Sequence, residues 1–377
     1  MKALKNITIY TEDKVIKNGY IKFDETIQEL GQGSIDGEDM QGMILIPGFI
    51  DQHIHGIHGY DVMDANKEVL DAFRTYLPKE GTTAYYATTM TASKEDIKKA
   101  LKNIASYETD KAGAELLGVH LEGPFISEVY KGAQNKEYIT SMSKEIMDEY
   151  IQEANDKIKH VTLAPELEGA SNFITYLKDQ NIVVSLGHSD ASEHKVKEAL
   201  NSGAVCFTHA FNAMSKLHHR DIGMVGMMLQ RKDAYAELIA DTIHVNKEAM
   251  KLLYKIKGED NIILVTDAMR AKQLAKGRYD LGGQEVIVND KEARLEDGTL
   301  AGSVLEYIDG VKNMQNHLDL SIQELIKISS LNPAKLHQID DRKGSIRLGK
   351  DADMLLLDQN FNIVRTYTRG ELVYQRD

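Results

Sequence analysis

The chain of 377 residues is 42% hydrophobic and 27% charged, which is typical of a folded globular protein and excludes a largely disordered one. Its 45 basic and 58 acidic residues give a net charge of −13, which argues against nucleic acid or an anionic membrane as the main partner. Cys206 is the only cysteine, so neither an intrachain disulfide nor a thiolate zinc cluster can form.

The sequence shows no targeting or membrane-spanning signal. The first residues, Met1 to Asn6, lack the apolar segment of a signal peptide. No apolar run approaches the roughly 18 residues that are needed to cross a bilayer. We therefore expect a cytoplasmic protein without a membrane partner, and the single cysteine fits a reducing compartment.

Both ends of the chain are predicted to form short β-strands. Apolar segments separated by charged turns are found at residues 7–10, 19–23, 352–357, 362–364 and 371–374. We predict that residues 1–46 and 344–377 together form a small β-sandwich domain.

The middle of the chain, residues 47–343, alternates short apolar runs with amphipathic stretches of helical length. The apolar runs are residues 44–50, 82–89, 116–121, 160–163, 182–186, 204–208, 235–240 and 261–265. Nearly continuous apolar character is typical of strands that are buried on both faces of a parallel sheet. The best helix candidates between the runs are residues 93–107, 143–156 and 193–202. Eight strand–helix units predict an α/β fold, a (β/α)8 TIM-like barrel, with a doubly wound open sheet as the alternative.

A His-x-His pair follows the first apolar run. His53 and His55 are two residues apart, and strand alternation places positions i and i+2 on the same side. Both imidazoles can then bind one metal ion. An isolated His-x-His motif is a weak signal of a metal site. Its position just after a buried strand makes the signal stronger.

Ligand-type side chains also follow five of the later runs. In chain order they are Glu122, His188, His209, the pair Asp241 and His244, and Asp267. The carboxyl ends of barrel strands converge on one face of the barrel, where catalysis takes place. Unrelated core residues would not gather at that position, so the pattern predicts a barrel and a metal site together.

The donor set indicates the class of metal. Imidazole and carboxylate without thiolate suit Zn²⁺, Fe²⁺, Mn²⁺ or Co²⁺. An ion with an open coordination position lowers the pKa of bound water toward neutrality. A carboxylate beside that water can take up its proton and later deliver it to a leaving group. Asp267, at the end of the last run, is our candidate for this task.

Most other histidines are given structural interpretations. We expect His120, inside the third run, to be a hydrogen-bonded core residue and His58 to be a loop residue. Surface or helix positions are expected for His160, His194, His317 and His337. Cys206 lies inside the sixth run and is expected to be a buried, unreactive thiol.

Six stretches in chain order carry a family resemblance. They are PGFIDQHIH (47–55), HLEGPF (120–125), GHS (187–189), THAFNAM (208–214), IADTIH (239–244) and VTDA (265–268). Through them the chain resembles the amidohydrolase superfamily over essentially its whole length. The resemblance implies a metal-dependent barrel with a small β domain. It also implies hydrolysis of the acetamide of an N-acetyl amino sugar 6-phosphate, with the gluco epimer as the expected substrate.

The resemblance implies a set of metal ligands. These are Glu122, His188 and His209 for the main ion, and His53 and His55 for a second ion. Glu122 would bridge the two ions, and Asp267 would contact the metal-bound water. Some members of the family lack the His-x-His pair and use one ion, so both one and two ions per subunit stay open.

The resemblance also implies the substrate contacts, which are Ala133, Gln134, Asn212, Ala213, Arg220, Asp241, Thr242, Ile243, His244, Leu300, Ala301 and Gly302. Among these, the candidates for binding the phosphate are Arg220, His244 and the backbone N–H groups of Asn212 and Ala213, since arginine binds phosphate in a bidentate fashion. Arg220 would reach into the site of a neighbouring subunit, which implies a homodimer. Gln134 departs from the family pattern, because many relatives have a histidine there that helps to polarise the acetamide carbonyl.

Three alternatives stay open at this point. The same reaction on the galacto epimer is the nearest one, because few contacts read a single epimeric hydroxyl. A different amidohydrolase, such as a cyclic amidase or a nucleobase deaminase, is disfavoured by the HLEGPF and NAM stretches. A catalytically inactive scaffold is disfavoured because Asp267 and the whole ligand set are present.

Overall fold

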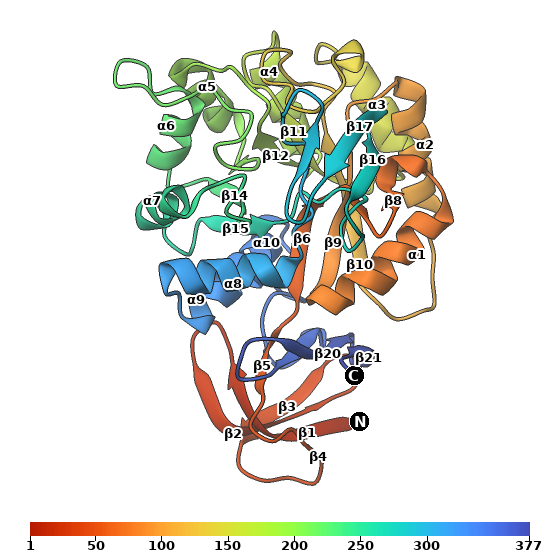
Figure 1. Cartoon of the computed structure of the whole chain (residues 1–377), viewed down its shortest axis with the longest axis vertical. Helices are drawn as coiled ribbons and strands as arrows, with labels where there is room; N and C mark the ends of the chain where they lie inside the picture. Colours follow the sequence, from red (N-terminus) through yellow and green to blue (C-terminus); the bar gives the residue numbers. More distant parts are fainter.

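The computed structural model describes residues 1–377, and its central feature is a barrel of eight parallel strands (Figure 1). In chain order these are β6 (Phe49–Ile54), β9 (Thr82–Thr89), β10 (Glu115–Glu122), β11 (Ile158–Leu163), β12 (Val183–Leu186), β13 (Cys206–Phe207), β14 (Tyr235–Ile239) and β15 (Ile262–Val265). A bridge between Ile54 and Ala268 joins the end of the last strand to the first. The backbone N–H of Asp267 donates to the carbonyl of His53 (2.8 Å) at the same seam. The predicted barrel is confirmed, and the open-sheet alternative is wrong.

Helices connect successive strands and cover the outside of the barrel. They are α1 (Lys67–Tyr76), α2 (Lys94–Ser106), α3 (Lys144–Glu153), α4 (Ala170–Asp179), α5 (Glu193–Ser202), α6 (Gly223–Gln230), α7 (Lys247–Lys257) and α8 (Tyr307–Leu318), followed by α9 (Ile322–Ile326) and α10 (Asn332–Leu336). The three predicted helices correspond to α2, α3 and α5. Ser93 and Ser143 begin two of them by accepting backbone N–H groups of the first turn at 3.2 Å.

The two chain ends form a second β structure below the barrel (Figure 1). Its strands are β1 (Lys2–Tyr10), β2 (Val15–Phe23), β3 (Ile27–Gln32), β4 (Glu38–Asp39), β5 (Ile44–Pro47), β19 (Met354–Leu357), β20 (Ile363–Thr368) and β21 (Glu371–Gln375). They join in one continuous sheet with its own apolar core, in which Ile9, Phe23 and Met354 are fully buried. The prediction that both ends build one small β domain is confirmed.

The prediction of residues 44–50 as one barrel strand is wrong. β5 pairs with β1 and β19 in the terminal sheet, whereas β6 pairs with β9 in the barrel. The chain passes from one sheet to the other at Gly48, whose N–H donates to the carbonyl of Asp353 (3.0 Å). A Cβ at this position would clash with the side chain of Thr83, so only glycine allows the close crossing.

A three-stranded sheet that the sequence interpretation missed is inserted between β15 and α8. It consists of β16 (Gly277–Leu281), β17 (Gln284–Val288) and β18 (Ala293–Leu295). Gly282 and Gly283 form the first turn with φ values of 60° and 80°, as a two-residue hairpin turn with left-handed backbone requires. The buried side chains of Val286 and Met269 belong to one apolar cluster that fixes the sheet beside the barrel mouth.

Short elements complete the chain. They are β7 (Gly56–Ile57) and β8 (Tyr60–Asp61), the 3₁₀ helices Val62–Asp64, Leu77–Glu80 and Lys136–Tyr138, and the π-helix Lys327–Leu331. No helix combines the length and the apolar character that a membrane crossing requires.

Two histidines fill the interior of the barrel. His120 is buried as predicted, with Nδ1 3.0 Å from the Gln52 carbonyl and Nε2 2.8 Å from Thr162 Oγ1. The expectation that His160 lies at the surface or in a helix is wrong, because it is a fully buried residue of β11 whose ring stacks on His120 at 4.1 Å. His337 follows α10 and stacks on Tyr86 at 4.0 Å.

Candidate metal centre and active site

Three of the predicted ligands form one compact group at the carboxyl ends of the strands. Glu122 ends β10, while His188 and His209 each lie two residues beyond the ends of β12 and β13. The Nε2 atoms of the two histidines each lie 3.2 Å from Glu122 Oε1 and 3.0 Å from one another. All three side chains are nearly or fully buried, so their donor atoms face each other and little solvent.

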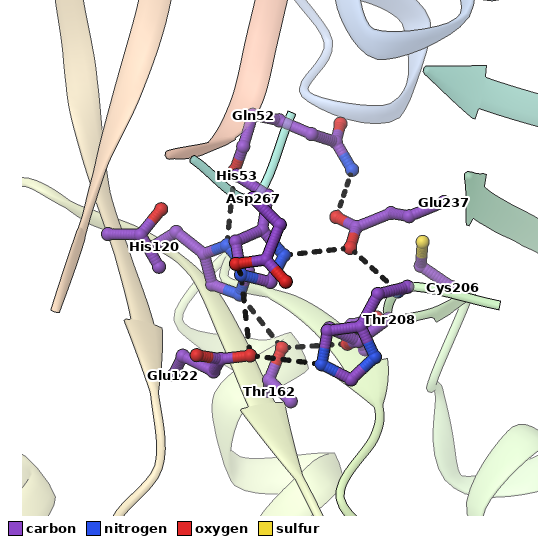
Figure 2. A network of polar contacts seen from close by, with 12 residues as sticks. Gln52, His53, His120, Glu122, Thr162, Cys206, Thr208, Glu237 and Asp267 are labelled. Atoms are coloured by element: carbon purple, nitrogen blue, oxygen red, sulfur yellow. Dashed lines mark hydrogen bonds and ion pairs between the residues drawn. The ribbon is translucent and has the colours of Figure 1, made fainter. Parts of the chain in front are cut away.

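The other three ligands form a second group that shares Glu122. His55 Nε2 lies 3.3 Å from Glu122 Oε2 and 3.2 Å from Asp267 Oδ1. His53 Nε2 lies 3.3 Å from Glu122 Oε1 and 3.5 Å from Asp267 Oδ1. Figure 2 shows His53, Glu122 and Asp267 directed toward a common point. Glu122 therefore lies between the two groups: its Oε1 faces His188, His209 and His53, and its Oε2 faces His55.

The geometry of both groups fits a divalent metal ion. Ligand atoms of a tetrahedral ion with bonds of about 2.0–2.1 Å lie about 3.4 Å apart, and the observed separations are close to this. His53 Nε2 is buried and has no hydrogen-bond partner, although it points at two carboxylates. A buried ring nitrogen without a partner is explained when it serves as a metal ligand.

Three of the histidines are held in the tautomer that metal binding needs. Nδ1 of His188 lies 2.9 Å from the Tyr130 carbonyl, and Nδ1 of His55 lies 3.2 Å from the Thr88 carbonyl. Nδ1 of His53 lies 3.0 Å from a carboxylate oxygen of Glu237. Each partner accepts a hydrogen bond from Nδ1–H, which keeps the proton on Nδ1 and leaves the Nε2 lone pair free to face the site.

The backbone is strained at the strand ends that carry these ligands. His188, His209 and Asp267 have φ values of 48°, 31° and 48°, in the left-handed region that non-glycine residues rarely adopt. Such conformations cost about 1–3 kcal/mol each and concentrate at functional sites. Here they turn each side chain from the strand end into the centre.

The electrostatics of the centre call for a cation. Burial opposes the charged form of His55, but hydrogen bonds to Asp267 and Glu122 raise its pKa to about 9. Burial likewise opposes charge on His53, and the carboxylates of Glu122, Asp267 and Glu237 raise its pKa well above the usual value. Burial raises the pKa of Asp267, but His53 and His55 lower it to about 2, so Asp267 is a carboxylate at neutral pH. Buried negative charge therefore exceeds positive charge here unless protons or a metal ion are taken up.

A cavity of about 480 Å³ opens directly above the two ligand groups. His55, Glu122, His188, His209 and Asp267 form part of its wall. Of the predicted substrate contacts, those that line it are Ala133, Gln134, Asn212, Ala213, His244, Leu300 and Gly302. The structure thus brings the predicted ligands and most of the predicted substrate contacts to one pocket.

The amidohydrolase family model matches residues 44–373, which is most of the chain. This chain belongs to the amidohydrolase family. It is 42% identical to N-acetylglucosamine-6-phosphate deacetylase of Bacillus subtilis, over 98% of this chain and 96% of that protein. It is 38% identical to N-acetylgalactosamine-6-phosphate deacetylase of Escherichia coli O157:H7, over 87% of each chain. The crystal structure of N-acetylglucosamine-6-phosphate deacetylase from Thermotoga maritima superposes with a TM-score of 0.91 at 35% identity, covering 99% of this chain and 100% of that one.

Five predicted contacts of this amidohydrolase lie outside the cavity wall, and these are Arg220, Asp241, Thr242, Ile243 and Ala301. Asp241 acts on the pocket through its neighbour, because its Oδ2 lies 2.6 Å from His244 Nδ1 and thereby orients the ring. Ala301 is fully buried behind the wall. Arg220 is exposed on a loop, where its guanidinium contacts His219 Nε2 at 2.8 Å.

Gln134 is placed differently from the role that the family pattern suggests. Its Nε2 donates to Glu122 Oε2 (2.7 Å), and its Oε1 accepts the backbone N–H of Thr91 (2.7 Å). The side chain is 2% exposed, and both ends of its amide are engaged by the protein. In this amidohydrolase Gln134 therefore holds the Glu122 carboxylate in place, and its second N–H has no partner within the protein.

Sequence reasoning missed a carboxylate behind the ligands. Glu237 lies in β14, is fully buried, and contacts Gln52, His53 and the backbone of His209 (Figure 2). Burial raises its pKa, but His53 outweighs this effect and the pKa is lowered overall. The signal was present, since a glutamate interrupts the otherwise apolar run of residues 235–240.

Several other residues of two pocket walls were also missed. The loop after β10 contributes Glu128, Val129, Tyr130, Lys131 and Gly132, and the β16–β18 insertion and its following loop contribute Leu281 and Thr299. Lys131 is the only lysine or arginine that lines the cavity, so it supplies positive charge in an acidic protein. Gln284 of β17 hydrogen-bonds to the carbonyl of Ala133, which joins the two walls. Their sequences carry no metal-ligand pattern that would have indicated a place in the cavity wall.

Proposed function

We propose that this protein is a metal-dependent N-acetylglucosamine-6-phosphate deacetylase. It hydrolyses the acetamide of N-acetyl-D-glucosamine 6-phosphate to D-glucosamine 6-phosphate and acetate. The observation that carries the proposal is the convergence of Glu122, His188, His209, His55 and Asp267 on one cavity. The family membership and the similarity to deacetylases over nearly the whole chain support the same substrate class.

We assign the main ion to Glu122, His188 and His209, and a second ion to His53 and His55 with Glu122 between them. The two ligand groups in the structure support this assignment. A bound divalent ion polarises the acetamide carbonyl and lowers the pKa of water toward neutrality. The imidazole and carboxylate donors suit Zn²⁺, Fe²⁺, Mn²⁺ or Co²⁺, with one or two ions in each subunit.

Asp267 moves the proton in this mechanism. Its carboxylate lies at the cavity wall, 3.2 Å from His55 Nε2 and 3.5 Å from His53 Nε2, so it can accept a proton from the attacking water. The water oxygen forms a bond to the acetamide carbon, and the carbon–nitrogen bond then breaks. Asp267 returns the proton to the nitrogen, because an amine leaves poorly without it. The products are acetate and the free amino sugar.

The phosphate is assigned to the far side of the pocket. The His244 ring and the backbone N–H of Ala213 lie at the cavity wall and can donate to phosphate oxygens. The N–H of Asn212 is not free for this role, because it donates to the carbonyl of His209 (3.0 Å). We infer that Arg220 of a second copy completes the phosphate site in a homodimer, because within its own chain this arginine is exposed and outside the wall. Asp241 orients His244, and Leu300 and Gly302 face the sugar, with Ala301 buried behind them.

We also propose a cytoplasmic location. The single, buried cysteine and the phosphorylated substrate both fit a reducing compartment that supplies sugar phosphates.

The deciding experiment measures acetate release by metal-loaded protein from three substrates. These are N-acetylglucosamine 6-phosphate, its galacto epimer and unphosphorylated N-acetylglucosamine. We expect rapid release from the first substrate only. No release from any of them, with metal present, would contradict the proposed activity and leave the amidohydrolase family membership intact.

The galacto epimer is the second candidate substrate. The relative that is 38% identical over 87% of each chain is an N-acetylgalactosamine-6-phosphate deacetylase. Faster release from the galacto epimer in the same assay would replace the gluco epimer as the substrate.

A further inference from the structure

Glu237 is a buried acidic side chain that has no part in the chemistry described above. It lies in the middle of β14, is 0% exposed, and its carboxylate points toward His53 (Figure 2). An ionised carboxylate in such a place is costly unless hydrogen bonds compensate it. The hydrogen-bond partners of Glu237 therefore indicate its role.

The Glu237 carboxylate accepts three hydrogen bonds, from His53, from its neighbour Gln52 and from the backbone of His209. Oε2 accepts from Nδ1 of His53 (3.0 Å) and from the backbone N–H of His209 (3.2 Å). Oε1 accepts from Nε2 of Gln52 (2.8 Å). One carboxylate thus joins a ligand of the second group to the backbone of a ligand of the main group.

The contact with His53 has a specific chemical consequence. A carboxylate at Nδ1 keeps the proton on that nitrogen and leaves the Nε2 lone pair free, directed at Glu122 and Asp267. The corresponding Nδ1 atoms of His55 and His188 face neutral backbone carbonyls. His53 is therefore the ligand that receives a full negative charge behind it, which makes its Nε2 the stronger electron donor.

We propose that Glu237 is a positioning residue that fixes His53 toward the metal centre and thereby sets the affinity of the second metal ion. This inference rests on the proposed metal-dependent function, because it concerns one of the two assigned ion positions. Loss of a hydrogen-bond partner behind a metal-binding histidine typically weakens metal binding about 10- to 100-fold. The main ion should be retained in such a variant, because Glu237 contacts no side-chain nitrogen of His188 or His209.

The test is a titration of the metal-free full-length chain with Co²⁺, followed by dialysis and elemental analysis. Glu237→Gln removes the charge and keeps the shape, and we expect one ion bound as in the wild type and the second weakened at least about tenfold. Glu166→Gln is the matched control. Glu166 accepts from Ser189 Oγ and the Asp190 N–H at 2.7 Å beside a ligand strand, yet it touches no ligand imidazole. We expect this control to bind both ions normally.

A second variant and a spectroscopic measurement distinguish a specific effect on His53 from misfolding of the Glu237→Gln chain. Gln52→Leu removes the amide that holds Oε1 of Glu237 without changing any charge, and it should weaken the same ion to a smaller extent. In nuclear magnetic resonance spectra of protein labelled at histidine nitrogen, the Nδ1–H signal of His53 should shift in Glu237→Gln. A purely structural role for Glu237 would leave that signal in place.

Several results would overturn the inference. These are wild-type affinity for both ions in Glu237→Gln, equal loss in Glu166→Gln, or a wild-type chain that binds only one ion. The proposed activity is judged separately by acetate release from the wild-type protein. A wild-type enzyme that releases acetate beside a Glu237→Gln variant with unchanged ion binding would refute the role of Glu237 alone.

Discussion

Replacing Asp267 by asparagine tests the proton transfer that the proposed activity requires. Asparagine has nearly the same shape and removes the carboxylate that lies 3.2 Å from His55 Nε2 and 3.5 Å from His53 Nε2. The backbone at this position has φ 48°, in the left-handed region, which asparagine tolerates better than other non-glycine residues do. We therefore expect Asp267→Asn to fold normally and to retain the main ion.

The expected loss follows from the two tasks of this carboxylate. General acid–base catalysis contributes about 10²- to 10⁴-fold to a rate. Because Asp267 both accepts the proton from water and returns it to the amine, we expect kcat to fall at least about 1000-fold. This corresponds to about 4 kcal/mol of additional barrier. The KM should change little, since the cavity wall keeps its shape.

The assay is acetate release at saturating N-acetylglucosamine 6-phosphate, with the metal content of each preparation measured in parallel. Asp190→Asn serves as the control, because Asp190 follows another ligand strand but its side chain is exposed. We expect the control to match the wild type. A metal-loaded Asp267→Asn enzyme that retains more than about a tenth of the wild-type kcat would refute the acid–base role.

The remaining predictions concern the phosphate, the ligand network and the response to pH. Arg220→Ala should raise KM for the phosphorylated substrate far more than for unphosphorylated N-acetylglucosamine, as steady-state kinetics on both can measure; equal effects would remove Arg220 from the phosphate site. Gln134→Leu leaves the Thr91 N–H and Glu122 Oε2 without their hydrogen-bond partner. The melting temperature should therefore fall by an amount equivalent to about 1–3 kcal/mol, and metal binding should weaken. An unchanged melting temperature and metal content would contradict this role of Gln134. Burial lowers the pKa of His337 from 6.5 to about 3, so its contribution to stability is present above pH 6.5 and is lost as the pH falls toward 3. Denaturant unfolding of His337→Phe between these limits should show a pH slope that is smaller by up to about 1.4 kcal/mol per pH unit, and an unchanged slope would show that this ring does not titrate there.

The barrel could be predicted because the physical signal is local and repeated. Each strand buried on both faces must be apolar, and each ends where a polar side chain turns into the site, as at Glu122, His188 and Asp267. The prediction that residues 44–50 form one barrel strand failed because apolar character does not show which sheet a strand joins. The change of sheet at Gly48 depends on its contact with Thr83, a residue that is distant in the sequence.

Parts of the site escaped sequence reasoning for a related reason. Glu237 and His160 are polar residues inside apolar strands, and the side to which each points depends on the register with neighbouring strands. A glutamate inside such a run must have a buried partner, but only the structure identifies that partner as His53. The β16–β18 insertion gave one usable signal, the pair Gly282 and Gly283. This pair fits the two-residue turn of a β-hairpin and does not match the glycine pattern of a phosphate-binding loop.

The seam of the barrel has a consequence for how the chain folds. β6 is the first barrel strand to be synthesised, and its second neighbour, the segment around Ala268, follows more than two hundred residues later. Until that segment arrives, one edge of β6 has free backbone groups that could pair with another chain. The edge carries Asp51, Gln52 and His53, and polar inward-facing side chains are a known means by which proteins discourage such pairing. The pairing that closes the barrel at Ala268 therefore also removes this free edge.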